Sequence, residues 1–150
     1  MTGHTVYSTL HTNDAASAVT RLAEMGVESY LIASSLAAVL AQRLVRVLCD
    51  RCKEPAGTAA APDGRWVPAW RPRGCEACRG QGFSGRVGIF ELLEIDDQAR
   101  RVIATDGGAA ELLDTARRRG MRSLRDDGWD KIASGITSVD EVMRVTQEQE

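Results

Sequence analysis

The sequence predicts an α/β fold that is interrupted by a cysteine-rich insertion. Residues 4–10 and 86–95 are apolar, β-branched runs of the kind that form strands, whereas residues 15–25 carry apolar side chains at helical spacing. Two Cys-x-x-Cys pairs, which begin at Cys49 and Cys75, lie between these regions. The chain of 150 residues suits one domain or two small ones, and its 43% apolar content is enough for a hydrophobic core.

The first predicted strand, His4 to Leu10, lies close to the first residue of the chain. A buried strand needs a paired neighbour on each side, so this arrangement suggests that the chain is part of a longer protein. The polar residues that follow include Asn13 and Asp14, either of which can cap a helix from Ala15 to Met25. Gly26 stands just past the end of this predicted helix, where glycine is favoured.

A second helix is predicted from Ser29 to Leu48, because leucine, isoleucine and valine recur there at helical spacing. Its uncharged part, residues 29–42, is fourteen residues long, which is shorter than the roughly 20 apolar residues that a membrane-spanning helix needs. Residues 56–72 are rich in Ala, Gly and Pro, and we expect them to form an irregular loop.

After the cysteine region, the strand from Arg86 to Ile95 leads into a tail that is predicted to form three or four short helices. Two pairs of residues in this tail have the spacing of capping boxes, in which side chains satisfy free backbone N–H groups. These pairs are Ser123 with Asp126 and Ser138 with Glu141. The glycines expected just past helix ends are Gly120 and Gly135.

Charge is distributed unevenly along the chain. Residues 43–86 hold nine Lys or Arg against four acids, while residues 87–150 hold nine against fourteen. A basic middle and an acidic tail indicate two units with different surfaces. The net charge of −2 gives no general attraction to nucleic acid or acidic lipid. The first residues lack a basic segment followed by an apolar run, so no secretory signal is predicted.

The two cysteine pairs are separated by twenty-two residues. Two residues between thiolates let one tight turn offer both to the same metal, and two such turns complete a tetrahedron. All four ligands are thiolates, so we expect structural zinc held by Cys49, Cys52, Cys75 and Cys78. Loss of the metal is expected to disorder residues 49–85 and to leave the helical tail folded. The alternatives are free core cysteines, a redox pair, or one copy of the Cys-x-x-Cys-x-Gly-x-Gly repeat of some Hsp40 chaperones.

No Gly-x-x-x-x-Gly-Lys-Ser/Thr sequence occurs, so the chain offers no standard phosphate-binding loop. Gly80, Gly82 and Gly85 have the spacing of a dinucleotide fingerprint, but they precede a predicted strand and not a helix. Tight turns explain these glycines better. Of the two histidines, His11 is a better functional candidate than His4, because it directly follows a predicted strand among polar residues. A purely structural role is the alternative for either histidine.

Four segments, taken in chain order, carry a resemblance to a known family. They are Thr2 to Asp14, Ala41 to Cys52, Gly74 to Glu91, and Ser123 to Thr146. In that order they resemble the His box, the entry to the metal-binding subdomain, its exit, and the C-terminal end of the secretion and pilus traffic ATPases. The type II secretion ATPases (general secretion pathway protein E) are the most similar. The type IV pilus assembly ATPases are very similar and also carry the cysteines, which retraction ATPases generally lack.

This resemblance implies a partial RecA-like core at residues 1–48 and an inserted tetracysteine zinc-binding subdomain at 49–85. The returning strand and a small C-terminal helical subdomain would occupy residues 86–150. The intact protein would be a homo-hexamer that hydrolyses ATP with magnesium at the cytoplasmic face of the inner membrane, bound to platform proteins. Hydrolysis would drive pseudopilus assembly and protein export across the outer membrane by type II secretion, or pilus extension. The resemblance places His11 near the γ-phosphate, and Arg86 near the nucleotide or an adjacent subunit.

The family's phosphate-binding loop, acidic boxes and Walker B motif would lie before Met1, so this chain alone is predicted to be inactive as an ATPase. The alternative is a free-standing zinc-ribbon module that binds nucleic acid or protein, which the basic segment 43–86 favours. Aromatic residues that could stack on bases are few between residues 49 and 85, namely Trp66, Trp70 and Phe83. No specific nucleic-acid binding is therefore predicted.

Overall fold

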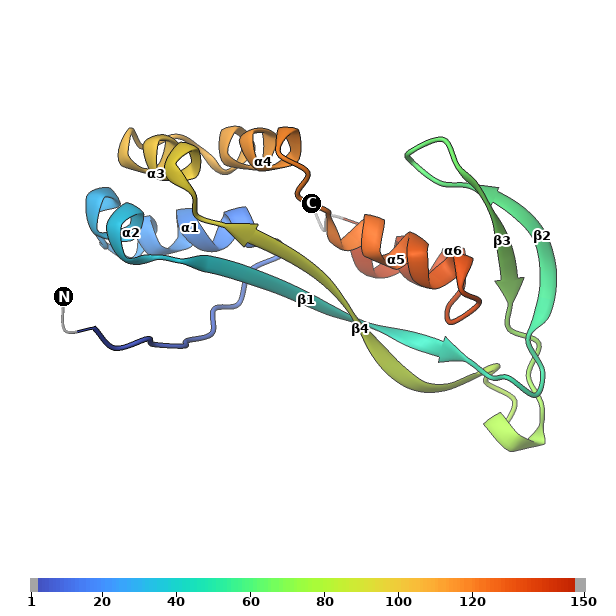
Figure 1. Ribbon diagram of the computed structural model, residues 1–150. Coiled ribbons are helices and arrows are strands. Elements are labelled where there is room, and N and C mark those ends of the chain that lie inside the picture. Colours follow the sequence, from blue (N-terminus) through green and yellow to red (C-terminus); the bar gives the residue numbers. More distant parts are fainter. Residues whose placement is uncertain (1–2, 148–150) are drawn as a thin grey trace.

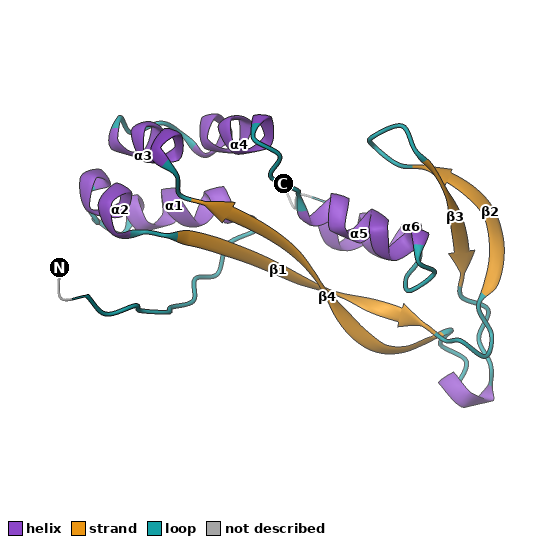
Figure 2. Cartoon of the chain, in the orientation of Figure 1, coloured by secondary structure: helices purple, strands orange, loops and turns teal. Residues whose placement is uncertain are grey.

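A long, twisted ribbon of two antiparallel strands organises the molecule (Figure 1). The computed structural model describes residues 3–147, so Thr2, the first residue of the N-terminal motif, lies outside the described residues. The ribbon consists of β1 (Ala38–Leu48) and β4 (Phe83–Glu94). Helices lie along most of the ribbon, and a smaller hairpin lies at its far end (Figure 2).

The helix predicted after Asp14 is confirmed as α1 (Ala15–Glu24). The Asp14 carboxylate accepts a hydrogen bond from the backbone N–H of Ser17 at 2.7 Å, which satisfies one of the free donors at the helix start. Gly26 adopts a φ of 86° just past the helix end, as predicted for a residue that lacks a Cβ. Local signals therefore determine both ends of this helix.

The strand predicted at residues 4–10 is not formed. This segment is irregular and exposed, with Val6 82% and Tyr7 92% accessible to solvent. Within residues 3–147, the strands pair only as β1 with β4 and β2 with β3, so none is available to this segment. A strand needs a hydrogen-bonding neighbour, and the apolar character of these residues cannot replace one.

The single helix predicted from Ser29 to Leu48 is also wrong. The segment begins with a short helix, α2 (Ser29–Ser35), and continues as the strand β1 from Ala38 to Leu48. Backbone pairing with β4 runs from Ala38 opposite Glu94 to Leu48 opposite Phe83. In a run this rich in leucine, valine and alanine, apolar residues fit a period of two as well as a helical period. The distant partner strand decides between them.

The region predicted to be an irregular loop forms a hairpin of β2 (Glu54–Ala60) and β3 (Trp66–Arg71). Pro55 and Pro68 are tolerated because each strand has only one neighbour, so a missing N–H can face outward. The pairing register shifts between Pro55 and Thr58, where Gly57 has a φ of 81°. The Ala, Gly and Pro composition led to the prediction of a loop, although the segment forms a pair of strands with an irregular register.

Up to residue 147, the last one described, the tail forms four helices, in agreement with the predicted three or four. They are α3 (Asp97–Ala104), α4 (Ala109–Arg118), α5 (Leu124–Ala133) and α6 (Val139–Thr146). Gly120 and Gly135 lie just past the ends of α4 and α5, as predicted. The Ser123–Asp126 capping box forms in both directions. Ser138 caps α6 through the N–H of Glu141, but the Glu141 carboxylate bonds to arginines elsewhere, so only half of the second box forms.

The buried side chains form two main cores along the ribbon. One core joins α1–α4 to the end of β4 and includes Ile32, Leu93 and Leu112. The other joins α5 and α6 to the middle of the ribbon and to the hairpin, where Val67 packs in the same cluster as Trp129. The cysteine region thus shares a hydrophobic core with the last two helices. Among residues 3–147, no helix is both long enough and apolar enough to span a membrane.

Candidate functional site

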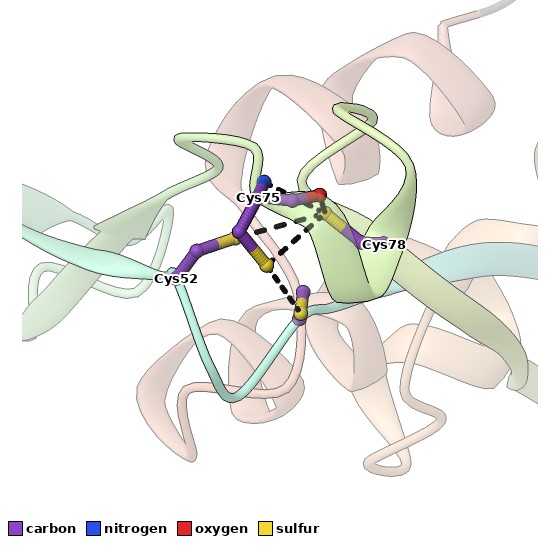
Figure 3. Close-up of side chains that lie close together, drawn as sticks. Cys52, Cys75 and Cys78 are labelled. Carbon is purple, nitrogen blue, oxygen red and sulfur yellow. Dashed lines mark hydrogen bonds between the residues drawn. The ribbon is translucent and has the colours of Figure 1, made fainter.

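Two tight turns, at the end of the ribbon where β1 ends and β4 begins, present the four cysteines. Figure 3 labels three of them, Cys52, Cys75 and Cys78. Cys49 follows β1 directly, and its carbonyl accepts hydrogen bonds from the N–H groups of Cys52 at 3.1 Å and Lys53 at 2.9 Å. Cys75 precedes the 3-10 turn η1 (Glu76–Cys78), and its carbonyl accepts from the N–H of Gly80 at 2.8 Å. Each turn therefore points both of its thiols toward the other turn.

The sulfur positions fit a tetrahedral metal. Three Sγ–Sγ distances are 3.9 Å for Cys49–Cys75, 3.8 Å for Cys52–Cys78 and 3.8 Å for Cys75–Cys78. All four Sγ atoms lie within 4.8 Å of one another. Zinc–sulfur bonds of about 2.3 Å in a tetrahedron require sulfur separations of about 3.8 Å, whereas a disulfide requires about 2.05 Å. The cluster can therefore hold one metal ion, and none of its cysteines is in a disulfide.

Backbone N–H groups stabilise the thiolate of Cys78. The Cys78 sulfur accepts hydrogen bonds from the N–H of Cys75 at 3.2 Å and of Gly82 at 3.1 Å. These backbone donors lower the pKa of the Cys78 thiol to about 6. Burial has the opposite effect on Cys52, whose pKa is raised to about 11. A cation at the centre would favour the deprotonated form of all four sulfurs.

The glycines around the second cysteine pair serve close backbone approaches. A Cβ on Gly74 would lie 2.5 Å from the carbonyl oxygen of Gly80, and Gly74 also has a φ of 96°. A Cβ on Gly82 would collide with Pro72. The segment from Gly80 to Gly85 leads into β4 and not into a helix, so it lacks the context of a dinucleotide site.

The first cysteine turn is fastened to the loop between α5 and α6. Lys53 Nζ donates to the carbonyl oxygen of Gly135 at 3.0 Å and also lies over the ring of Trp70. The Leu48 N–H donates to the carbonyl oxygen of Ile136 at 2.8 Å. These contacts bring the candidate metal centre against the last two helices.

The two remaining predicted site residues lie apart from the cysteines. His11 is exposed, and no hydrogen bond joins its side chain to the described part of the chain, residues 3–147. Four residues later α1 begins, and Arg43 of β1 donates to the Asn13 side chain at 2.8 Å. Arg86 of β4 lines a cleft of about 910 Å³ that also includes Asn13 and Asp14. The structure thus brings the four cysteines together but does not bring His11 and Arg86 into one site.

Sequence reasoning missed two buried carboxylates, Glu91 and Glu141, which are 4% and 1% exposed. Glu91 could have been found, because the strand containing it was predicted. It alternates in phase with the apolar Ile89 and Leu93, so it falls on the buried face. Glu141 pairs with Arg46, ninety-five positions earlier in the chain, and no local pattern indicates that contact.

Comparisons with known proteins agree over nearly the whole chain. A family model described as "Type II/IV secretion system protein" matches residues 1–144. Type II secretion system protein HxcR of Pseudomonas aeruginosa is 51% identical over 148 residues, which cover 99% of this chain and 29% of that protein. Type II secretion system ATPase E of Vibrio cholerae is 48% identical over 157 residues, which cover 99% of this chain and 31% of that protein.

A pilus protein is also similar. Type IV pilus assembly ATPase PilB of Thermus thermophilus is 45% identical over 161 residues, which cover 99% of this chain and 18% of that protein. The chain therefore spans less than a third of the length of these curated relatives. The family match, the high identities and the clustered cysteines agree, and the chain belongs to the type II/IV secretion system protein family.

Proposed function

We propose that this chain is the C-terminal part of a hexameric ATPase that couples ATP hydrolysis to pseudopilus assembly and protein export by type II secretion. The observation that supports this proposal is the sequence identity to HxcR (51%) and to ATPase E (48%), each over 99% of this chain. Residues 1–48 would belong to a RecA-like core, residues 49–85 to a zinc subdomain, and residues 86–150 to the returning strand and a helical subdomain. The whole protein would work in the cytoplasm, on platform proteins of the inner membrane.

Pilus extension is the second candidate, and the similarity to PilB favours it. The two functions differ in the fibre that is assembled and not in the chemistry of ATP hydrolysis. Deletion of the full-length gene separates them, since loss of a secreted enzyme with normal pili supports type II secretion. Loss of pili with normal secretion supports the pilus function.

Zinc is the metal that we propose for the cysteine cluster. Four thiolates suit a soft or borderline-soft cation, and a closed tetrahedron leaves no position for a substrate. Cys49, Cys52, Cys75 and Cys78 would hold the ion, which would cross-link the segment after β1 to the segment before β4, at the same end of the ribbon. The ion would stabilise the fold and take no part in ATP hydrolysis.

Purified, reduced protein is expected to contain one zinc ion per chain, because the four sulfurs fit a single tetrahedron. Cys75→Ser should lower the zinc content, since a hydroxyl is a poor zinc ligand. Glu76→Gln is the matched control, as Glu76 lies in the same turn and is exposed. Elemental analysis by mass spectrometry measures the content. Less than half an equivalent in the unaltered protein would contradict the zinc assignment.

ATP hydrolysis would require parts of a longer protein. Catalysis of phosphoryl transfer needs a cradle of backbone N–H groups, a lysine and acids that hold magnesium. No Gly-x-x-x-x-Gly-Lys-Ser/Thr sequence occurs in these 150 residues. We propose that His11 senses the γ-phosphate or orients the attacking water once those parts are present. Arg86 would approach the nucleotide or a neighbouring subunit, and its place in an arginine-lined cleft supports this.

The isolated chain is expected to show no ATP turnover and no submillimolar ATP binding. In the full-length protein, His11→Ala should lower kcat more than it raises KM, because His11 would act at the reacting phosphate. His4→Ala, which alters the other histidine of the same segment, is the control. Calorimetry and steady-state turnover measure the two effects. Submillimolar ATP binding by the isolated chain, or an unchanged kcat in His11→Ala, would contradict the respective assignment.

A zinc-ribbon module for nucleic acid is the competing function, and the basic segment 43–86 is the observation in its favour. We expect only weak, salt-sensitive attraction, because basic side chains attract phosphates whatever the base sequence and aromatic residues are few between residues 49 and 85. Fluorescence anisotropy with single- and double-stranded oligonucleotides, at low and physiological salt, tests this. Micromolar binding that persists at physiological salt would favour the zinc-ribbon function.

A further inference from the structure

Glu91 joins the starts of two helices that are distant in sequence. Its side chain is 4% exposed on β4. One carboxylate oxygen accepts a hydrogen bond from the N–H of Ala15 at 3.0 Å, and the other accepts from the N–H of Leu124 at 3.4 Å. Ala15 is the first residue of α1 and Leu124 is the first residue of α5. In Figure 1 these helices lie one after the other along the ribbon.

This arrangement explains how a carboxylate can be buried there. The first N–H groups of a helix lack partners within the helix, and the helix dipole adds partial positive charge at that end. Both helices already have capping side chains, but Asp14 and Ser123 bind the deeper N–H groups of Ser17 and Asp126. Glu91 accepts from the first N–H groups, which those caps leave free. Two helix starts thus stabilise one buried charge.

The start of α1 is also the end of the segment that contains His11. Arg43 on β1 holds Asn13, and Glu91 on β4 holds Ala15. The short connection after His11 is therefore fastened to both strands of the ribbon. Through Leu124, the same carboxylate is fastened to α5. Leu124 at the start of α5 and Ala15, which follows the His11 segment, thus donate to the same carboxylate. A movement of α5 would therefore be transmitted through Glu91 to the residues that follow His11.

We propose that Glu91 is a positioning residue for His11 and links the His11 segment to the C-terminal helices. The role at His11 rests on the proposed function, whereas the link between α1 and α5 does not. In this proposal Glu91 acts through the His11 segment and not on the nucleotide. It fixes where the His11 segment enters α1, and it makes that position depend on α5.

Hydrogen exchange of this chain tests the link without any ATPase assay. Glu91→Gln should make exchange roughly tenfold or more faster in residues 15–18 and 124–127 together, as expected for the loss of charge-assisted hydrogen bonds. Glu94→Gln, on the exposed face of the same strand, is the control and should change neither segment. Unchanged exchange in both segments, or a change in only one of them, overturns the link.

Ala15→Pro is a second variant that leaves Glu91 in place. Proline is favoured at the first position of a helix and removes the N–H that donates to Glu91. The preceding Asp14 is already extended, with φ −144° and ψ 175°, as proline requires. This variant should retain α1 by circular dichroism and should speed exchange at residues 124–127, which it does not touch. Normal exchange there overturns the link even if Glu91→Gln fails to fold.

Turnover of a full-length protein that contains this chain tests the positioning role. Glu91→Gln should lower kcat on the order of tenfold with KM for ATP little changed, since misplacement of a catalytic group affects the reacting state. Glu91→Asp, which keeps the charge, should recover part of the loss. Normal turnover in Glu91→Gln, when His11→Ala is impaired, overturns the positioning role and leaves the proposed function standing. Normal turnover in His11→Ala overturns both roles at His11, while exchange still decides the link.

Discussion

Removal of the metal is expected to release α5 and α6 as well as the cysteine turns, while α1–α4 remain folded. Structural zinc contributes on the order of 10 kcal/mol of apparent binding energy in small sites, which is comparable with the roughly 5–15 kcal/mol that stabilises a whole domain. Lys53 and Leu48 bind the α5–α6 loop directly, and Val67 of the hairpin lies in the core with Trp129. The sequence led us to expect that the whole helical tail stays folded without the metal. The structure changes this expectation, because α5 and α6 share a core with the hairpin whereas α3 and α4 pack in the other core.

Hydrogen exchange before and after treatment with a chelator measures this result. The amides of α5 and α6 should lose protection with those of β2 and β3. The amides of α3 and α4 should keep theirs, because Ile103 and Leu112 pack in the other core. Cys75→Ser should reproduce the pattern without a chelator. Equal protection of α4 and α5 in the metal-free protein would show that the two cores do not separate in this way.

Replacement of Glu141 by glutamine is expected to lower the free energy of unfolding by about 1–3 kcal/mol, the usual effect of losing charge-assisted hydrogen bonds at a buried acceptor. Arg46 and Arg144 are 46% and 59% exposed, so water can solvate the guanidinium groups that lose this partner. The Glu141 carboxylate is 1% exposed and accepts from the Arg46 guanidinium at 2.7 Å, the Arg46 N–H at 3.0 Å and Arg144 at 2.7 Å. A glutamine amide must direct its NH₂ group toward one of these donors. Denaturant unfolding measures the loss, with the exposed neighbour Asp140→Asn as control. A difference below about 1 kcal/mol would contradict it.

The same residue predicts how stability depends on pH. Burial alone would raise the pKa of Glu141, but hydrogen bonds from Arg46 and Arg144 outweigh burial and lower the pKa from 4.5 to about 2. The folded pKa lies below the unfolded one, so this carboxylate stabilises the fold fully above pH 4.5. Its contribution falls as the pH drops toward 2. Unfolding measured across this range should show a component that Glu141→Gln lacks.

Local chemistry made part of this structure predictable. Asp14 and Ser123 predict the starts of α1 and α5, because their side chains accept hydrogen bonds from N–H groups only three positions away. The two cysteine pairs are equally local, since hydrogen bonds between near neighbours in the chain close each turn. A tetrahedral site could therefore be predicted from spacing, although the hairpin between the pairs could not.

The errors at residues 4–10 and 29–48 have one physical cause, which is pairing over long separations. β1 resembles a helix until β4 supplies its hydrogen-bonding partner, and residues 4–10 resemble a strand although no partner exists among residues 3–147. Glu141 follows the same principle, because its main partner lies on a strand ninety-five positions away. Sequence patterns indicate which secondary structure a segment prefers, whereas the β1–β4 pairing and the Arg46–Glu141 contact depend on which distant segments come together.

The buried face of the ribbon and the irregularity between Arg46 and Leu48 specify the register of its two strands. A slip of one residue displaces a strand by about 3.3 Å and exchanges its two faces. Such a slip would carry Cys49 away from Cys75, whose sulfurs lie 3.9 Å apart, and would turn Glu91 outward to the exposed side where Leu92 now lies. A metal ion bound by the four cysteines would therefore help to fix the register of β1 against β4. In that register the Glu91 carboxylate faces the starts of α1 and α5 and not water.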